Sequence, residues 1–432
     1  MSGVLIAAPS SGSGKTTITL GLLRALRNRG VALAPGKAGP DYIDPAFHTA
    51  ASGAPCVNYD PWAMRPELLR FNAGEAAGRD RAFIVEAMMG LHDASVDGTG
   101  SPADLACVLD LAVIMVVDCG RMAQSVAALV RGYAGHRADI RVAGVILNKV
   151  GSDRHEKMLR DALVAIHMPV LGVVRLDSRM KLPERHLGLV QASEHGELDA
   201  FIEHAASRVS GGCDLDAILA LAGTGRPDAT AIAGLKPLGQ RIAVARDVAF
   251  AFCYEHLLRD WRRQGCDISF FSPLADEAPQ AEADAVYLPG GYPELHAGAL
   301  SGARQFHAGM LAARDRDARI FAECGGYMTL GEGLVAADGK RYGMLGLLPL
   351  VTSFAERKRH LGYRRATPRN RSFFDGPLMA HEFHYATIVS EGDADRLFDT
   401  VDAAGEIVGP AGLQRGCVAG SFMHLIDMAV TA

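Results

Sequence analysis

A glycine-rich loop near the start of the chain carries the first residues that could do chemistry. Residues 9–17, PSSGSGKTT, lie between an apolar run and a stretch whose apolar residues have helical spacing. Backbone N–H groups of such a loop can surround phosphate oxygens, a lysine adds positive charge, and the following helix adds its dipole. Pro9 stands where the usual form of this loop has glycine. We predict a nucleotide-binding loop with contacts from Ser11, Gly12, Ser13, Gly14, Lys15, Thr16 and Thr17.

Two acidic residues could hold a metal ion beside this loop. Glu86 follows the apolar run 83–85, and Asp44 lies in a loop that also contains Lys37 and Asp41. Carboxylate and hydroxyl oxygens are the ligands that Mg²⁺ prefers. We therefore predict Mg²⁺ as a cofactor, held by Thr16, Glu86 and Asp44.

An amide side chain at the end of another apolar run could contact the base of a nucleotide. Asn148 and Lys149 follow the run 142–147, which resembles the base-contacting position of GTP-binding folds. An acid two residues after the lysine would favour guanine, but Gly151 stands there. We therefore predict ATP as the nucleotide, with Asn148 among its contacts.

A cysteine in the second half has the surroundings of a nucleophile. The apolar run 319–322 leads into Glu323-Cys324-Gly325-Gly326, and a helical stretch begins at Tyr327. A tight turn between a strand and a helix exposes its central side chain, and the start of the helix favours a thiolate. Since an ordinary thiol has a pKa near 8.5, a base is needed beside it. We predict Cys324 as the nucleophile.

The base is expected from a histidine late in the chain. His424 follows a short apolar stretch and is the leading candidate, with His384 as an alternative. The cysteine turn and the late histidine resemble those of class I glutamine amidotransferases, which usually carry an acid two residues after the histidine. Here Ile426 stands at that position and Asp427 lies one position further. The sequence therefore predicts a Cys–His pair and leaves open whether an acid assists His424.

A second glycine-rich turn could stabilise negative charge on a reacting carbonyl oxygen. Pro289-Gly290-Gly291 ends the apolar run 285–288, and paired glycines there leave backbone N–H groups available. Such groups form oxyanion holes. We expect this role from Gly291 and from Gly325.

The elements that must position these residues belong to two α/β domains. The 432 residues exceed the length of a single typical domain. Short β-branched runs alternate with helical stretches, which predicts a doubly wound, mostly parallel sheet in the first half and a further α/β domain in the second. Polar residues follow the strands at the rim where such sheets bind ligands. A linker rich in Ala, Gly and Pro at 221–239 places the boundary between domains 1–236 and 237–432. The strands expected are 4–8, 83–85, 112–117, 142–147, 170–174, 242–245, 268–271, 285–288 and 320–322, with a helix over 250–259.

Composition excludes several classes of protein. The formal net charge is -5 and the chain has no long basic tract, so nucleic acid is not the expected partner. We find no apolar run of about 18 residues and no signal peptide, which predicts a cytoplasmic protein without a membrane anchor. The eight cysteines lack the spacing of a metal site or a disulfide framework. The oligomeric state stays open, and a homodimer is among the states allowed.

Together the two kinds of site predict an ATP-driven amide synthesis. A cysteine site can release ammonia from glutamine, and a phosphate loop can convert a carboxylate into an acyl phosphate. Ammonia reacts usefully with a carboxylate only after such activation. We therefore expect ATP and L-glutamine as substrates, and a protected route for ammonia.

The second half resembles class I glutamine amidotransferases, and nearly the whole chain resembles cobyrinic or hydrogenobyrinic acid a,c-diamide synthases. The matching segments are 39–48 (GPDYIDPAFH), 182–189 (LPERHLGL), 289–295 (PGGYPEL), 322–326 (AECGG), 361–364 (LGYR) and 382–385 (EFHY). The resemblance implies that two glutamines and two ATP with Mg²⁺ serve to amidate carboxylates a and c of a corrin ring in cobalamin biosynthesis. One departure is Ala87, where the family has glycine after the acid. Related cobyric acid synthases carry a GDIDRGG segment that this chain lacks.

A corrin polycarboxylate would require cationic and hydrogen-bonding contacts. We expect them from Arg185 and His186 in the segment 182–189, from Tyr363 and Arg364 in the segment 361–364, and from Asp41 in the segment 39–48. The sequence does not distinguish a cobalt-containing corrin from a metal-free one.

Two alternatives remain at this point. One is a P-loop ATPase switch fused to a degenerate, ligand-sensing amidotransferase-like domain, which would not require a nucleophilic thiol. The other is an amidase acting on a different tetrapyrrole.

Overall fold

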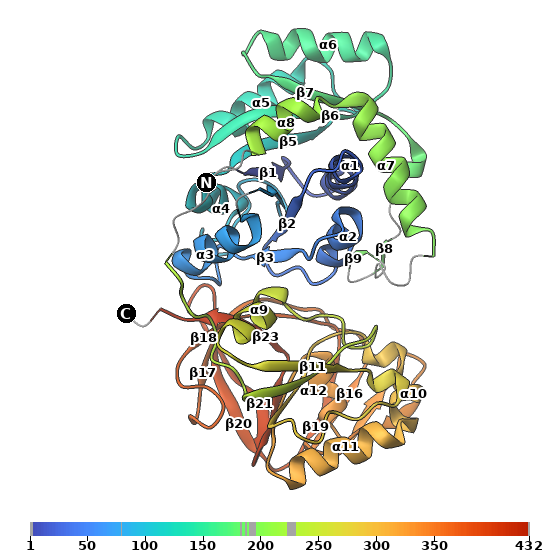
Figure 1. Ribbon diagram of the computed structural model, residues 1–432, viewed down its shortest axis with the longest axis vertical. Coiled ribbons are helices and arrows are strands. Elements are labelled where there is room, and N and C mark those ends of the chain that lie inside the picture. The colour runs from blue at the N-terminus through green and yellow to red at the C-terminus, as the bar shows by residue number, and fades with distance from the viewer. Residues whose placement is uncertain are drawn as a thin grey trace. The chain divides into compact units, whose positions relative to one another are not determined.

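The computed structural model describes residues 3–78, 80–181, 184–185, 188–189, 196–222 and 230–430. The chain forms two compact units (Figure 1). The N-terminal unit comprises Met1–Trp62 and Pro66–Ile232, and the C-terminal unit comprises Ala63–Arg65 and Ala233–Ala432. The short segment 63–65 therefore packs with the second half of the chain.

A parallel seven-stranded sheet forms the centre of the N-terminal unit, in the order β3-β2-β4-β1-β5-β6-β7. Its strands are β1 (Val4–Ala7), β2 (Leu33–Ala38), β3 (Val57–Tyr59), β4 (Ala82–Glu86), β5 (Ala112–Asp118), β6 (Arg141–Val150) and β7 (Val170–Arg175). Strands β1 and β4 are buried along their whole length, as expected when helices cover both faces. The predicted α/β fold class is confirmed.

Helices α1, α2 and α7 lie on one face of this sheet, and α3 and α4 lie on the other (Figure 1). The helices are α1 (Lys15–Asn28), α2 (Asp44–Ser52), α3 (Pro66–Ala77), α4 (Pro102–Leu109), α5 (Ser125–Gly135), α6 (Asp153–Val164), α7 (Leu198–Gly212) and α8 (Leu215–Ala222). Smaller elements are the 3-10 turn η1 (Ser178–Met180) and the antiparallel pair β8 (Glu184–Arg185) and β9 (Gly188–Leu189). The carboxyl ends of β1, β4, β5 and β6 share one rim of the sheet.

Strands β2 and β3 are not among the predicted strands. The apolar pattern of β2 is interrupted by Pro35 and Gly36. Proline lacks an N–H donor and is rare in central strands. Pairing of β2 with the short strand β3 begins only at Gly36, so Pro35 is an edge position on that side. The pattern of apolar residues therefore understated the width of the sheet.

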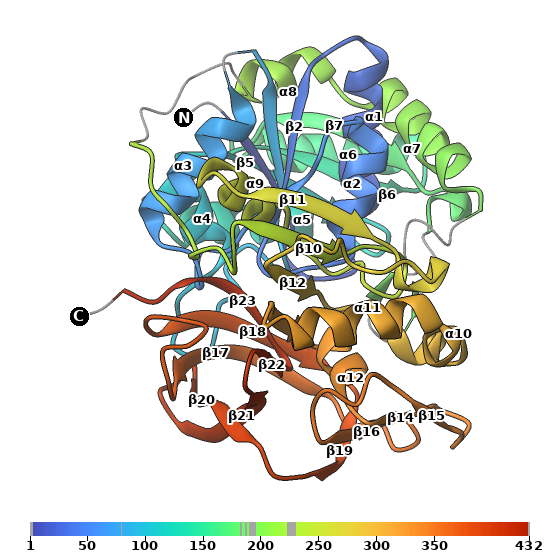
Figure 2. The same cartoon turned by 60° about the horizontal axis from the view of Figure 1, so that its bottom comes forward.

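The C-terminal unit contains a mixed ten-stranded sheet in the order β11-β10-β12-β13-β22-β21-β20-β17-β18-β23 (Figure 2). Its strands are β10 (Arg241–Ala245), β11 (Asp267–Phe271), β12 (Ala285–Leu288), β13 (Arg319–Glu323), β17 (His360–Pro368), β18 (Leu378–His384), β20 (Asp395–Asp402), β21 (Ile407–Arg415), β22 (Val418–Ser421) and β23 (Met423–Met428). A four-stranded sheet holds β14 (Gly333–Val335), β15 (Arg341–Gly343), β16 (Leu350–Ser353) and β19 (Thr387–Glu391).

The helices of this unit are α9 (Glu255–Arg263), α10 (Ala297–Gly302), α11 (Arg304–Asp315) and α12 (Gly325–Leu330), with 3-10 turns η3 (Pro273–Ala275) and η4 (Pro293–Leu295). The prediction of a helix over 250–259 is wrong at its start. Phe252 instead forms an isolated β-bridge with Gly290, and its N–H donates to the Gly290 carbonyl at 2.9 Å. Residues 250–254 thus support the glycine turn after β12.

The sheet curls so that its last strand returns to the strand that carries the cysteine. β23 pairs with β18, yet the N–H of Leu425 on β23 donates to Oε1 of Glu323 at the end of β13, at 3.0 Å. Strand β22 pairs with β13 and leads directly into β23, so the late histidine and the elbow cysteine lie close together. Among the described residues, no helix combines the length and the apolar character needed to cross a membrane.

Candidate active sites

The phosphate loop joins β1 to α1, and its glycines adopt conformations that other residues rarely adopt. Gly12 and Gly14 have φ values of 80° and 91°. A side chain at Gly14 would also clash with the amide of Asn148. The amino group of Lys15 donates to the carbonyl of Met89 at 2.5 Å, and burial lowers the pKa of Lys15. Glycine is thus needed for both the shape of the loop and its contact with β6.

A cavity of about 780 Å³ opens beside this loop. Its lining comes from the loop, from the ends of β2, β4 and β6, and from the segment after β7. Among the predicted site residues it includes Ser11, Gly12, Gly14, Lys15, Thr16, Thr17, Asp41, Asp44, Glu86 and Asn148. The structure therefore brings the predicted nucleotide and metal residues of this unit to one cavity at the expected rim, except Ser13, which is buried and does not line it.

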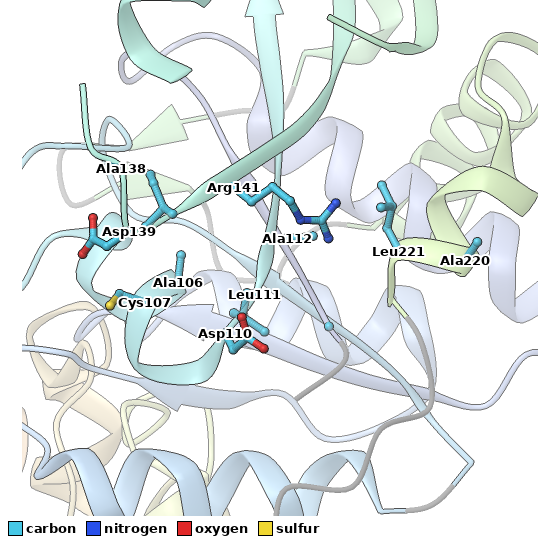
Figure 3. Close-up of a pocket in the computed structure, with 12 residues that line it drawn as sticks. Ala106, Cys107, Asp110, Leu111, Ala112, Ala138, Asp139, Arg141, Ala220 and Leu221 are labelled. Atoms are coloured by element: carbon cyan, nitrogen blue, oxygen red, sulfur yellow. The ribbon is translucent and has the colours of Figure 1, made fainter. Parts of the chain in front are cut away.

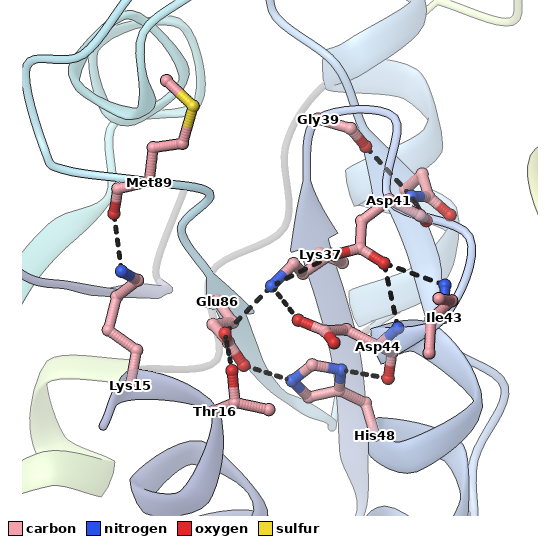
Figure 4. Close-up of polar contacts among 11 residues, drawn as sticks. Lys15, Thr16, Lys37, Gly39, Asp41, Ile43, Asp44, His48, Glu86 and Met89 are labelled. Atoms are coloured by element: carbon pink, nitrogen blue, oxygen red, sulfur yellow. Dashed lines mark hydrogen bonds and ion pairs between the residues drawn. The ribbon is translucent and has the colours of Figure 1, made fainter. Parts of the chain in front are cut away.

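Glu86 lies at the centre of a buried polar cluster (Figure 4). Its Oε1 accepts hydrogen bonds from Thr16 Oγ1 at 2.8 Å and from Lys37 Nζ at 2.9 Å. Lys37 also pairs with Asp44, and lies 3.8 Å from Asp41 Oδ2. Burial alone would raise the pKa of Glu86, but the charges of Lys37 and His48 lower it below its ordinary value. The carboxylate is therefore ionised and faces Thr16.

His48 is a member of this cluster that sequence reasoning missed. Its Nε2 lies 2.7 Å from Glu86 Oε2, and its Nδ1 lies 2.7 Å from the carbonyl oxygen of Asp44. Burial alone would lower the pKa of His48, but Glu86 raises it well above the ordinary value. Both ring nitrogens face acceptors, so the imidazolium fixes the orientation of Glu86. The only signal in the sequence was the position of His48 four residues after Asp44, one helical turn away.

Asp44 and Asp41 have structural partners of their own. Burial and the charge of Asp41 raise the pKa of Asp44 to about 6. Oδ1 of Asp41 accepts the backbone N–H groups of Ile43 and Asp44 at 2.8 and 2.9 Å, which caps the start of α2. The expected corrin contact from Asp41 stays a prediction.

Asn148 contacts the phosphate loop itself. Its Nδ2 donates to the carbonyl oxygen of Ser13 at 2.9 Å, and its Oδ1 accepts the N–H of Lys149. Lys149 Nζ lies 2.6 Å from Asp118 Oδ2. In this arrangement the amide holds the loop, and its predicted contact with a base stays a prediction.

Two predicted corrin contacts fall on the segment around β8 and β9. The side chain of Arg185 and the whole of His186 lie outside the described residues.

A second cavity, of about 470 Å³, lies at the opposite rim of the same sheet, where β5 and β6 begin (Figure 3). Its lining includes Asp110 and Asp139, and it meets the C-terminal ends of α4 and α8. Helix C-termini carry partial negative charge. This cavity is therefore unsuited to phosphate groups.

Cys324 occupies the tight turn between β13 and α12. Its φ of 44° and ψ of -105° lie outside the regions that non-glycine residues prefer. A side-chain carbon at Gly325 would lie 2.7 Å from Pro293 Cδ and 2.9 Å from the backbone nitrogen of Gly291. The two glycine turns expected to form an oxyanion hole are thus in direct contact.

His424 lies beside this cysteine. A side-chain carbon placed on Gly290 would lie 3.2 Å from Cys324 Cβ and 3.2 Å from His424 Nε2. His424 Nε2 and the side chain of Cys324 therefore both border the space beside Gly290. Burial, followed by the charges of His381 and His384, lowers the pKa of His424 well below its ordinary value. A neutral imidazole can accept a proton.

Glu323 is an acidic neighbour of His424 that the sequence did not reveal. It directly precedes Cys324, and its Oε2 lies 3.7 Å from His424 Nδ1. Its carboxylate also accepts the hydroxyl of Tyr287 at 2.7 Å and the N–H of Leu425 at 3.0 Å. Burial raises the pKa of Glu323 to about 8. The pairing of β13 with β22, which leads directly into β23, creates this contact, and the sequence pattern does not encode that pairing locally.

Asp427 does not serve His424. Its carboxylate binds Arg65, with Nε to Oδ2 at 3.0 Å, Nη2 to Oδ1 at 3.0 Å and the Arg65 backbone N–H to Oδ2 at 2.9 Å. The Asp427 side chain is fully buried. This bidentate pair fastens the segment 63–65 to β23.

The alternative base, His384, is engaged elsewhere. Its Nδ1 lies 3.0 Å from the carbonyl oxygen of Ala386 and its Nε2 lies 3.1 Å from Glu382 Oε1. Arg364, a predicted corrin contact, pairs with Glu382 Oε2 at 2.7 Å. The other, Tyr363, packs edge-on against His381 with ring centroids 5.3 Å apart. Both roles toward a corrin stay predictions.

The surroundings of the Cys324 thiol favour its protonated form. Burial, followed by the charge of Glu294, raises its pKa above the ordinary value, and the N–H of Gly325 opposes this only in part. The start of α12 therefore does not offset the desolvation of the thiol. A neighbouring base is required.

Comparisons with known proteins agree with both sites. Residues 4–190 match the family described as the CobQ/CobB/MinD/ParA nucleotide binding domain, and residues 241–429 match the CobB/CobQ-like glutamine amidotransferase domain. A protein of Sinorhizobium sp named hydrogenobyrinate a,c-diamide synthase is 73% identical, with 100% of each chain covered. Proteins of the same name from Rhizobium meliloti and Brucella anthropi are 71% and 59% identical, covering 99% of this chain and 100% and 99% of their own. The chain therefore belongs to the hydrogenobyrinate a,c-diamide synthase family.

Proposed function

We propose that this protein amidates the a and c carboxylates of hydrogenobyrinate, using ATP and the side-chain nitrogen of L-glutamine. Its relatives carry the name of this activity, and its two units match a nucleotide-binding domain and a glutamine amidotransferase domain. The observation that carries the proposal is the juxtaposition of His424 and Cys324 around Gly290. A ligand-sensing domain that catalyses no reaction would not need a histidine beside this cysteine.

The C-terminal unit would release ammonia. His424 Nε2 accepts the thiol proton, and the Cys324 sulfur attacks the side-chain amide carbon of glutamine. Backbone N–H groups of Gly291 and Gly325 would stabilise the oxyanion. His424 returns the proton to the leaving nitrogen as ammonia departs. Water then hydrolyses the thioester to glutamate. Glu323 would orient the imidazole throughout.

The N-terminal unit would activate the acid. The loop N–H groups and Lys15 bind the phosphates of ATP, and the substrate carboxylate attacks the γ-phosphorus. ADP leaves and an acyl phosphate forms. Ammonia then adds to the acyl carbon and phosphate departs, which leaves the amide. Lys37 adds positive charge to the same cavity.

The residues present fit Mg²⁺. Thr16 and Glu86 offer two adjacent oxygen donors 2.8 Å apart, and Asp44 adds a third that Lys37 now engages. When bound, Mg²⁺ would neutralise phosphate charge. His48 keeps Glu86 oriented toward Thr16.

The substrate named by the relatives is hydrogenobyrinate, and we propose the metal-free corrin over its cobalt-bearing counterpart. A mass measurement tests this. The enzyme with ATP, Mg²⁺ and glutamine should convert hydrogenobyrinate to a product with two amides, and the cobalt form more slowly. Equal or faster use of the cobalt form would contradict the choice. A cytoplasmic location and a homodimer stay predictions.

The assignment of His424 as base has its own test. The His424→Ala variant should slow alkylation of Cys324 by iodoacetamide at neutral pH, since the thiol loses its proton acceptor. Mass spectrometry of the peptide containing Cys324 gives the rate. A rate equal to that of the parent would remove His424 from the mechanism.

A further inference from the structure

An acidic residue near the thiol site has no role in the scheme above. Glu294 belongs to η4, which directly continues the glycine turn at Gly290 and Gly291. This turn packs against the start of α12, since a side-chain carbon on Gly325 would lie 2.7 Å from Pro293 Cδ. Glu294 is therefore placed one residue beyond the contact between the two glycine turns.

One oxygen of the Glu294 carboxylate lacks a hydrogen-bond partner among the described residues. This oxygen, Oε2, is buried. A buried carboxylate oxygen without a donor is costly, and native structures rarely leave one so. Burial raises the pKa of Glu294 to about 7, an effect that the backbone N–H of Glu294 and, to a smaller extent, the charge of exposed Arg357 oppose. The site is built to receive a cation or a strong donor.

The other two carboxylates near the thiol differ from Glu294 in this respect. Glu323 accepts hydrogen bonds from Tyr287 and from the N–H of Leu425. Glu382 pairs with Arg364 and with His384. Only Glu294, among these three, has a buried oxygen that nothing in the described chain satisfies.

Glu294 also lies close enough to the sulfur for its charge to matter. Among the charged groups that act on the Cys324 thiol, Glu294 has the largest effect, ahead of Glu323 and Glu382. Coulomb effects fall with distance. A ligand whose reacting carbon meets the sulfur can therefore present a second group to Glu294.

We infer that Glu294 binds the α-ammonium group of L-glutamine while Cys324 attacks its side-chain amide. The inference rests on the proposed glutaminase reaction and adds the residue that recognises the amino-acid end of the substrate. An ammonium group would supply the missing donor to Oε2 in a charge-assisted hydrogen bond, which is stronger than a neutral one. Two methylene groups separate the α-carbon from the amide, so one molecule reaches both.

This contact would also couple binding to activation of the thiol. In the free enzyme the charge of Glu294, with those of Glu323 and Glu382, helps keep the sulfur protonated. A bound ammonium group cancels the largest of these charges, and the neutral imidazole of His424 stands ready to accept the proton. The thiol would then ionise most easily when glutamine is in place.

A double comparison of enzyme and substrate tests the contact. Glutaramic acid is glutamine without its α-amino group. We expect Glu294→Gln to raise the KM for glutamine roughly 10- to 100-fold, the range for a hydrogen bond to a charged group. In the parent, the KM for glutaramic acid should exceed the KM for glutamine by a similar factor. The Glu294→Gln variant should have similar KM values for the two amides. Glu294→Asp should recover part of the loss. The matched control is Glu406→Gln, an exposed change of the same charge in the β20–β21 turn.

Two further readouts make the outcomes decisive. Ammonia-dependent amidation should be unchanged in Glu294→Gln, and alkylation of Cys324 without glutamine should be faster than in the parent. The inference would be overturned if Glu294→Gln and removal of the α-amino group raised the KM independently, so that their factors multiplied. An unchanged KM in Glu294→Gln would also overturn it. Slower alkylation in both Glu294→Gln and Glu294→Asp would also overturn it, by indicating a structural role. A parent enzyme that never hydrolyses glutamine would instead defeat the proposed function as a whole.

Discussion

Glu323 Oε2 lies 3.7 Å from Nδ1 of His424, although the two residues are far apart in the sequence. Glu323 is the neighbour of the nucleophile on β13, and His424 lies on the last strand, β23. An acid that follows the histidine on its own strand is the usual arrangement in amidotransferases. Here the corresponding region supplies Asp427, which binds Arg65 instead. We therefore expect the orienting acid to come from the strand of the cysteine.

Replacement of Glu323 should weaken glutamine hydrolysis while leaving the synthetase half intact. Glu323→Gln places an amide where Tyr287 and Leu425 both donate hydrogen bonds, and it removes the charge that orients His424. We predict a loss of roughly 10²-fold in kcat for glutamine hydrolysis, the lower end of the range for a positioned proton-transfer group. Ammonia-dependent amidation should persist.

The pH profile separates positioning from structure in this case. The pKa of Glu323 is raised to about 8, so the ionised form that can accept Nδ1–H grows as pH rises toward that value. Glutamine hydrolysis by the parent should therefore increase between pH 6 and pH 8, as read from initial rates. In Glu323→Gln this rise should flatten, and Glu323→Asp should restore part of it. An unaltered profile in the Gln variant would indicate that Glu323 only supports the fold.

Asp427→Asn serves as the matched control on β23. Since Asp427 is bound to Arg65 and not to His424, glutamine hydrolysis by Asp427→Asn should stay within a few-fold of the parent at a temperature where the variant is folded. A loss as large as that in Glu323→Gln would show that Asp427 assists the histidine after all.

The Arg65–Asp427 pair should contribute to stability. Arg65→Ala would leave the fully buried Asp427 carboxylate without its bidentate partner. Breaking a buried ion pair from one side typically costs 3–5 kcal/mol. We therefore predict that Arg65→Ala lowers the unfolding free energy of the C-terminal unit by about 3 kcal/mol, measured by urea denaturation. Asp427→Asn should cost less, because Arg65 remains partly exposed to water. A change below about 0.5 kcal/mol in Arg65→Ala would contradict this account.

Stability should also depend on pH through Glu323. An unfolded glutamate has a pKa near 4.3, whereas the folded Glu323 has a pKa of about 8. The folded state therefore holds this proton more tightly, and the unfolding free energy should fall as pH rises from about 4 to 8. Glu323→Gln should show a smaller decline over this window in denaturation experiments. An identical decline in both proteins would assign the effect to other groups.

The Lys15→Ala variant tests whether the phosphate loop activates the carboxylate independently of glutamine hydrolysis. Lys15 lies in the phosphate loop, and its amino group donates a hydrogen bond to the carbonyl oxygen of Met89. We expect the variant to form no amide from either glutamine or ammonia, because the carboxylate is no longer activated. Glutamine hydrolysis should remain detectable by glutamate release. Normal product formation would remove the phosphate loop from the mechanism.

Local sequence patterns predicted the loops that carry the chemistry but not the contacts between distant strands. The phosphate loop and the Cys324 turn each depend on a short run of glycines beside a strand, which is visible in the sequence. Strand β2 was hidden by Pro35, which is tolerated because β3 pairs only beyond it. His48 and Glu323 acquire their positions through the packing of α2 and the pairing of β13 with β22, and no local pattern encodes either.

The balance of effects on the pKa of the Cys324 thiol could not be read from the sequence. The start of a helix favours a thiolate, but the burial of Cys324 and its neighbouring carboxylates outweigh that effect. Only the assembled site reveals which of these influences dominates.

The Cys324→Ala variant tests the central claim most directly. With hydrogenobyrinate, ATP and Mg²⁺, mass spectrometry should show no amidated product when glutamine is the nitrogen source. The same variant should form the diamide when ammonium chloride is supplied at a pH that leaves free ammonia. Diamide formation from glutamine by this variant, or loss of the ammonia-dependent reaction in a correctly folded protein, would contradict the assignment of nitrogen release to Cys324 and acid activation to the phosphate loop.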